Sequence, residues 1–138
     1  MADITVTAAR VGLLYPQKAD VRDYIAAVTI TKGQAVYILA AGTVGVADAN
    51  ASGAQQFRGI ALNGGGAGQA ISVLHDGECA GFTVTGNANT LLYLSDTAGA
   101  LADAAGTMTV AAARIICDSD KDATKVIRVF TQWEADWA

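Results

Sequence analysis

Residues 71–85 read ISVLHDGECAGFTVT, and this stretch indicates the fold class. Its two ends, Ile71–Val73 and Phe82–Thr85, alternate apolar with polar side chains. Such a period of two is typical of a strand with one buried face. The step between them, His75–Glu78, contains an Asp-Gly pair, which suits the positive φ angles of a tight turn. The stretch therefore predicts two strands joined by a hairpin, with His75 as a surface turn residue.

Strand patterns recur along the whole chain, whereas helix patterns are short. Further alternating or apolar runs occur at Ile4–Thr7, Val28–Thr31, Gln34–Leu39, Phe57–Leu62, Leu91–Leu94, Arg114–Cys117 and Val126–Phe130. Asp20–Val28 has helical spacing and could form two turns, although its end merges into a strand pattern. Ala100–Ala105 is rich in helix-favouring Ala but is too short to nucleate a helix alone. The sequence predicts an all-β fold, a small β-barrel or β-sandwich with little helix.

A faint internal repeat has an offset of about 55 residues. Val36-Tyr37-Ile38 matches Leu92-Tyr93-Leu94, and Ile71-Ser72-Val73 matches Ile127-Arg128-Val129. We interpret the repeat as two pseudo-repeated meanders within one domain. Chance matching in an Ala-rich chain is the alternative.

The chain divides into three segments. Residues 1–22 form an N-terminal arm or edge segment, residues 23–131 form the β-barrel or β-sandwich domain, and residues 132–138 form a C-terminal aromatic tail. The first segment contains the single proline, Pro16, and no hairpin partner of its own. It could be an edge strand of the same sheet or an arm that reaches a neighbour.

Composition argues against several classes of partner. The 138 residues carry a net charge of −4 and only 16% charged residues, so we expect no cationic face for nucleic acid. No apolar run approaches the ~18 residues of a membrane span, and the N-terminus has no signal-peptide pattern. We interpret Cys79 and Cys117 as reduced core thiols of a protein made in a cytoplasm.

Residues for catalysis or metal binding are few. The chain has one histidine, and no serine lies in a Gly-x-Ser-x-Gly turn. The glycine-rich Gly64–Gly68 stretch lacks the Lys-Ser/Thr ending of a phosphate loop. Asp118–Asp122 imitates the start of a calcium loop, but Ala123 and Val129 replace the required Gly and Glu. We therefore predict no enzyme activity, no metal site and no cofactor.

The unusual feature is the surface that this composition implies. With 29 Ala, 15 Gly and little charge, part of the outer face is expected to lie against other subunits, since interfaces deplete charge at their centres. A structural assembly protein fits this composition better than an enzyme does.

Residues 25–131 resemble the small capsid decoration (cement) proteins of tailed bacteriophages. The motifs that carry the resemblance are Ile30–Tyr37, Ala40–Val44, Phe57–Ala61, Ala67–Val73, Asp76-Gly77, Leu92–Ser95 and Ala98-Gly99. The resemblance implies a β-rich protein, commonly a homotrimer, that binds the major capsid protein at three-fold or quasi-three-fold points. It also implies location on the outer capsid surface of the virion, where the protein stabilises the mature head.

Candidate interface residues lie at both ends of the chain, outside the resemblance. An N-terminal strand could add to an exposed sheet edge through Ile4, Val6, Val11, Leu13, Leu14 and Tyr15. Trp133 and Trp137 are four residues apart, so one helical turn would place them on one face as interface anchors. The alternative is that these residues close the protein's own barrel.

Two other functions fit the same sequence. One is a β-sandwich module that binds cell-surface glycans, for which exposed aromatic side chains would line a groove. The other is a different structural part of a virion, such as a tail tube or a head fibre, which would assemble as rings of six or as fibres.

Overall fold

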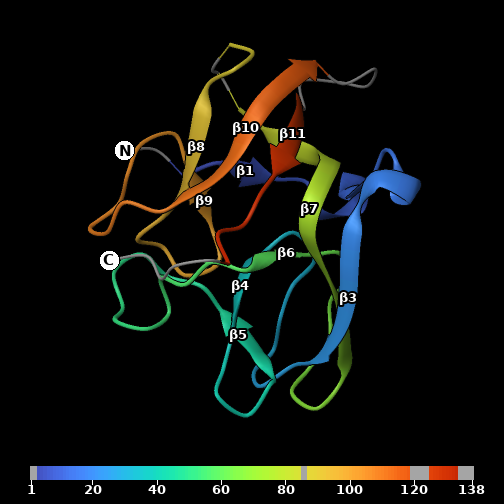
Figure 1. Cartoon of the computed structure of the whole chain (residues 1–138), viewed down its shortest axis with the longest axis vertical. Helices are drawn as coiled ribbons and strands as arrows, with labels where there is room; N and C mark the ends of the chain where they lie inside the picture. Colours follow the sequence, from blue (N-terminus) through green and yellow to red (C-terminus); the bar gives the residue numbers. More distant parts are fainter. Residues whose placement is uncertain (1–2, 85–86, 119–124, 134–138) are drawn as a thin grey trace.

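A computed structural model describes residues 3–84, 87–118 and 125–133. Within these residues the chain is all-β and contains no α-helix, which confirms the predicted fold class. A curled antiparallel sheet forms a half-barrel (Figure 1). Its elements are β1 (Thr5–Val6), η1 (Ala8–Arg10), β2 (Gly12–Leu13), η2 (Pro16–Lys18), β3 (Asp20–Ile25), β4 (Ala35–Ile38), β5 (Val44–Val46), β6 (Gly59–Ala61), β7 (Ala70–Thr83), β8 (Leu91–Leu94), β9 (Leu101–Ala102), β10 (Ala111–Asp118) and β11 (Lys125–Val129).

The longest strand, β7, runs without interruption through the predicted hairpin, so the prediction of a turn at His75–Glu78 is wrong. A hairpin would require the two halves of this stretch to pair with each other. Instead, β7 pairs with β3 and β6 up to Asp76, and with β11, β2 and β1 from Gly77 onward. Gly77 has a φ of +148°, a conformation that glycine adopts readily, and it marks where β7 passes from one part of the sheet to the other.

The predicted internal repeat is visible in the strand pairing. In the first unit, β4 pairs with β5 and β6, and β6 pairs with β7. In the second unit, β8 pairs with β9 and β10, and β10 pairs with β11. The matched tyrosines take equivalent places, because Tyr37 lies opposite Gly45 of β5 and Tyr93 opposite Ala102 of β9. This shared topology supports a true repeat over chance matching.

The N-terminal segment runs antiparallel along β7. Strands β1, β2 and β3 pair with β7 in turn, from its end to its beginning. Isolated bridges join Asp3 to Ala102 of β9 and Ala26 to Val44 of β5. The segment therefore connects β7 to β9 and β5, the strands at the two ends of the sheet. This arrangement corresponds to the alternative in which these residues close the protein's own barrel.

The short helical pattern at Asp20–Val28 does not form a helix. Its first six residues form β3, which pairs with β7 along its whole length. An isolated two-turn helix is only marginally stable, so this pairing overrides the local pattern. The Ala-rich stretch after Gly99 likewise contains strand β9.

The strand predicted at Val28–Thr31 is reduced to one bridge between Ile30 and Gly65. Ile30 is nevertheless buried, at 1% exposure. The alternating pattern thus identified the buried side chain correctly but not the regular strand.

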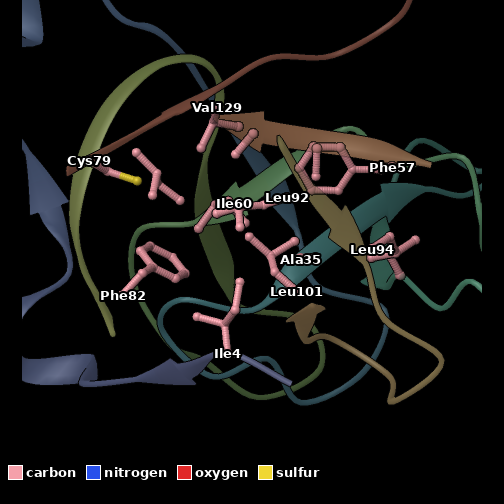
Figure 2. Packing of buried hydrophobic residues seen from close by; sticks show 14 of the residues in the cluster. Ile4, Ala35, Phe57, Ile60, Cys79, Phe82, Leu92, Leu94, Leu101 and Val129 are labelled. Atoms are coloured by element: carbon pink, nitrogen blue, oxygen red, sulfur yellow. The ribbon is translucent and has the colours of Figure 1, made fainter. Parts of the chain in front are cut away.

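Buried side chains form two clusters on opposite faces of the first unit's sheet. Leu74 and Ile60 are register partners in the larger cluster, and the adjacent pair Val73 and Ala61 belongs to the smaller one. Successive strand residues point to opposite faces, so β6 and β7 separate the two clusters. Figure 2 shows part of the larger cluster, in which side chains from both units and from Ile4 converge.

Candidate interaction surface

The structure distributes the predicted interface residues between the core and the surface. Ile4 and Val11 are buried at 7% and 4% exposure and belong to the protein's own core, so they present no surface to a neighbour. Val6 and Leu13 are partly buried against the same cluster. The remaining described residues of this set, Leu14, Tyr15 and Trp133, are exposed, and Trp137 lies outside the described residues.

Most of the exposed large apolar side chains lie on β3 or close to it in the sequence. Seven large apolar residues of the described chain are exposed: Leu14, Tyr15, Val21, Ile25, Val28, Ile116 and Trp133. Val21 and Ile25 belong to β3, Leu14 and Tyr15 precede it across η2, and Val28 follows it. Ile116 lies on β10, and Trp133 follows β11. Figure 1 shows β3 on the outer side of β7. We call Leu14, Tyr15, Val21, Ile25 and Val28, with the outer edge of β3, the β3 surface.

Trp133 contacts a buried histidine that also forms a hydrogen bond with Tyr24 of β3. The Tyr24 hydroxyl lies 2.7 Å from His75 Nε2, and the ring centroids of His75 and Trp133 are 5.0 Å apart in an edge-to-face arrangement. The Arg58 guanidinium lies over the Trp133 ring, 4.9 Å from its centroid, and donates to the Gln132 carbonyl at 2.8 Å. The exposed Trp133 ring is therefore held in place from two sides, in a segment that is not helical.

His75 is 1% exposed, so its assignment as a surface turn residue is wrong. The cause is the continuous β7, which directs residue 75 inward instead of carrying it into a loop. The Arg58 carbonyl lies 2.5 Å from Nδ1 and can only accept, so Nδ1 carries the proton. Nε2 then accepts from the Tyr24 hydroxyl, and burial raises the pKa of Tyr24, which keeps that hydroxyl protonated.

The two edges of β3 differ in whether their backbone groups are paired with another strand. The Ala26 N–H donates to the Gln69 carbonyl at 2.9 Å, on the side of β7. Successive residues of a strand direct their backbone groups to alternate sides. By this alternation Tyr24 faces β7, whereas Val21 and Asp23 direct their N–H and C=O groups outward.

The outward edge is open at the start and middle of β3 and is closed at its end. There Ala26 bridges Val44 of β5 in parallel, and the Ala27 N–H donates to the Val44 carbonyl at 2.8 Å. Among residues 3–84, 87–118 and 125–133, no strand pairs with the outward side of Val21 or Asp23. An open edge of this kind is a template for an added strand.

Charges of both signs accompany this edge. Arg22 and Asp23 are exposed, and the Asp23 carboxylate accepts a hydrogen bond from Ser72 Oγ at 2.7 Å. At the start of the strand, Asp20 lies opposite Asp76 of β7. Burial raises the pKa of the Asp76 carboxyl; the Arg128 guanidinium opposes this rise, and the charge on Asp20 adds to it.

The glycine-rich Gly64–Gly68 stretch uses its amides within the protein. The N–H groups of Gly65 and Gly68 donate to the carbonyls of Ile30 and Ala26, and that of Gly66 donates to Gln69 Oε1. These amides are therefore not free to hold an anion.

Other sequence candidates have mixed outcomes. Cys79 is buried as predicted, whereas Cys117 is exposed, so its assignment to the core is wrong; both thiols are free. The described residues contain no group of three or more His, Cys, Asp or Glu able to hold a metal ion. Positions 119–124, which belong to the stretch that imitates a calcium loop, lie outside the described residues. No helix in the described part of the chain is long and apolar enough to cross a membrane.

Sequence reasoning missed β3 and the residues behind it, Tyr24, Arg58 and His75. The sequence contains a signal for this strand, because the β-branched and aromatic residues of Asp20-Val21-Arg22-Asp23-Tyr24-Ile25 favour a strand. No protein-family model matches the chain, and no curated protein is detectably similar to it.

Proposed function

We propose that this chain is a structural protein of a phage virion, a capsid decoration (cement) protein. It binds the outer surface of the head where capsomers meet and stabilises the mature shell as a homotrimer. The observations that carry the proposal are the open strand edge at Val21 and Asp23 and the exposed large apolar side chains, five of which lie on β3 or close to it in the sequence. The resemblance of residues 25–131 to decoration proteins supports the same function.

The surface suits protein contact. Exposed apolar residues beside charged ones, as at Val21, Arg22 and Asp23, are typical of protein–protein interaction sites. Trp133 is held against His75 and Arg58 and loses little freedom on binding, which favours its use as an anchor.

The mechanism follows from linkage. A protein that binds only the expanded lattice stabilises that lattice, as any ligand stabilises the state that it prefers. Many symmetric copies on one shell multiply modest contacts through avidity. The stabilisation comes from the surface that is buried between the protein and adjacent capsomers, and no covalent bond is made or broken.

The test is to mix the purified full-length chain with undecorated expanded shells of its phage and to sediment the mixture. We expect saturable co-sedimentation with expanded shells, little with unexpanded ones, and a trimer mass in solution. The Trp133→Ala variant should bind more weakly than the Ile116→Ala variant, whose exposed side chain lies on β10. A monomer that stays in the supernatant and binds glycans would contradict the proposal.

A further inference from the structure

Asn63 and Gly64 form the single Asn-Gly pair of the chain. This pair is chemically labile, because no side chain shields the amide nitrogen of a glycine. The Gly64 nitrogen can attack the carboxamide carbon of Asn63, which closes a cyclic succinimide and releases ammonia. Water then opens the ring at either carbonyl and leaves aspartate, or its β-linked isomer isoaspartate, at position 63.

In the folded chain the Asn63 side chain takes the place of a strand residue. Strand β6 ends at Ala61, and the Leu62 N–H donates to the Ser72 carbonyl of β7 at 2.8 Å. Asn63 continues this pairing with its carboxamide: Oδ1 accepts from the Ser72 N–H at 2.6 Å, and Nδ2 donates to the Ala70 carbonyl at 3.1 Å. A backbone N–H only donates and a carbonyl only accepts, so this pairing fixes the orientation of the carboxamide.

These two hydrogen bonds oppose the reaction. Ring closure brings the carboxamide carbon to the nitrogen of Gly64 and expels Nδ2, the atom that donates to Ala70. The carboxamide must turn out of the plane in which it meets β7, so we expect both bonds to break before the ring forms. The rate then depends on how often Asn63 leaves β7, which is a local opening that costs free energy in a folded protein.

We infer that Asn63 is a site of spontaneous deamidation that the fold masks, and that its modification is irreversible. A carboxylate at position 63 has no N–H to donate to the Ala70 carbonyl, and sets an oxygen against that carbonyl oxygen. The isoaspartate product also reroutes the main chain through the side-chain carbon. Neither product restores the original pairing, so an opening that ends in reaction leaves the contact between Asn63 and β7 permanently weaker.

The affected part of β7 also carries β3. Ala70 is the register partner of Ile25, and Ser72 is the register partner of Asp23, to which its Oγ donates at 2.7 Å. Modification at Asn63 should therefore lower the stability of the pairing on both sides of β7. This consequence does not depend on the proposed function.

Peptide mapping by mass spectrometry tests the masking. The full-length chain is incubated at mildly alkaline pH, folded and in urea, and aspartate plus isoaspartate at position 63 is measured over time. The loss of Asn63 should be at least about tenfold slower in the folded chain, because reaction is confined to the opened fraction. The internal control is Asn87, which is exposed and followed by Ala88. Its rate should differ far less between the two states.

Two further comparisons separate the chemistry from the pairing. In urea, where folding plays no part, the Gly64→Ala variant should lose Asn63 about as slowly as the parent loses Asn87, because a methyl group then shields the amide nitrogen. In urea unfolding, the Asn63→Asp variant should have a lower midpoint than the Asn87→Asp variant. The first loses the donor to the Ala70 carbonyl, whereas Asn87 is exposed.

Three results would overturn the inference. Equal loss of Asn63 in the folded and unfolded chains would show that the fold does not mask it. Loss of Asn63 in urea no faster than that of Asn87 would remove the modification site. Equal midpoints for the Asn63→Asp and Asn87→Asp variants would show that the product keeps the pairing with β7.

Discussion

Tyr24 of β3 and His75 of β7 meet through a hydrogen bond of 2.7 Å between the tyrosine hydroxyl and Nε2. Their rings lie edge to face, with centroids 5.6 Å apart. This contact fastens an otherwise exposed edge strand to the interior and places it next to Trp133. The β3 surface thus depends on a polar pair that is buried on the histidine side.

The Tyr24→Phe variant should lose stability because His75 Nε2 is left buried without its partner. A buried, unsatisfied polar atom costs about 1–3 kcal/mol. Urea unfolding followed by circular dichroism measures this loss. The control is the Tyr37→Phe variant, whose hydroxyl has no hydrogen-bond partner among the described residues; its change should stay within about 0.5 kcal/mol. Equal losses in the two variants would contradict the role given to the Tyr24 hydroxyl.

Asp3 should make the fold sensitive to acid. Hydrogen bonds from Ser95 and Thr97 lower the pKa of Asp3 below its ordinary value of 3.8. The ionised group therefore contributes stability above pH 3.8, and this contribution is lost as the pH falls through the lowered pKa. Thermal unfolding at a series of pH values should show a smaller acid loss for the Asp3→Asn variant. If the variant and the parent lose the same stability in acid, the role given to Asp3 is wrong.

Asp76 should affect the pH dependence of stability in the opposite direction to Asp3. Burial raises its pKa, so the folded chain binds this proton more readily than the unfolded chain does. The contribution of Asp76 to stability is full below the ordinary value of 3.8 and is lost as the pH rises through the raised pKa. The Asp76→Asn variant should therefore be more stable than the parent at neutral pH, and this advantage should disappear in acid. A variant that is less stable at neutral pH would contradict the sign.

Gly59 should tolerate no side chain. Its φ is +148°, and a Cβ there would lie 2.3 Å from the Leu74 carbonyl oxygen in the adjacent strand. The Gly59→Ala variant should lose at least about 2 kcal/mol of stability or fail to fold. At Gly12 an added Cβ would meet nothing within 4 Å, so the Gly12→Ala variant is the matched control. A stable Gly59→Ala variant would mean that β6 and β7 pack less closely than described.

The two thiols should differ in reactivity. Burial raises the pKa of Cys79 to about 12, whereas Cys117 is exposed. Because the thiolate is the reactive form, a disulfide reagent at mildly alkaline pH should modify one thiol per chain quickly. The Cys117→Ser variant should show no fast phase. A fast phase that survives this substitution would show that Cys79 is accessible.

Sequence patterns predicted the fold class and the repeat because both depend on local alternation and on motif order. They failed where a distant strand decides the outcome. Asp76-Gly77 has the composition of a turn, yet β6, β11 and the N-terminal strands supply partners for both halves of β7. The same pairing turned a weak helical pattern into β3.

The candidate surface was predictable only in part. Leu14, Tyr15 and Trp133 are exposed, as expected for residues that contact a partner, whereas Ile4 and Val11 lie in the core. A periodic pattern says which residues share a face of a strand, but it does not say which neighbour covers that face. Because Ile4 and Val11 lie in the core, removal of residues 1–15 should unfold the chain.

The most direct measurement is difference density from electron cryomicroscopy of expanded shells, with and without the full-length chain. The proposed function predicts added density on the outer surface at capsomer junctions, at three-fold or quasi-three-fold points. Shells that remain bare at saturating protein, or added density elsewhere on the virion, would contradict it.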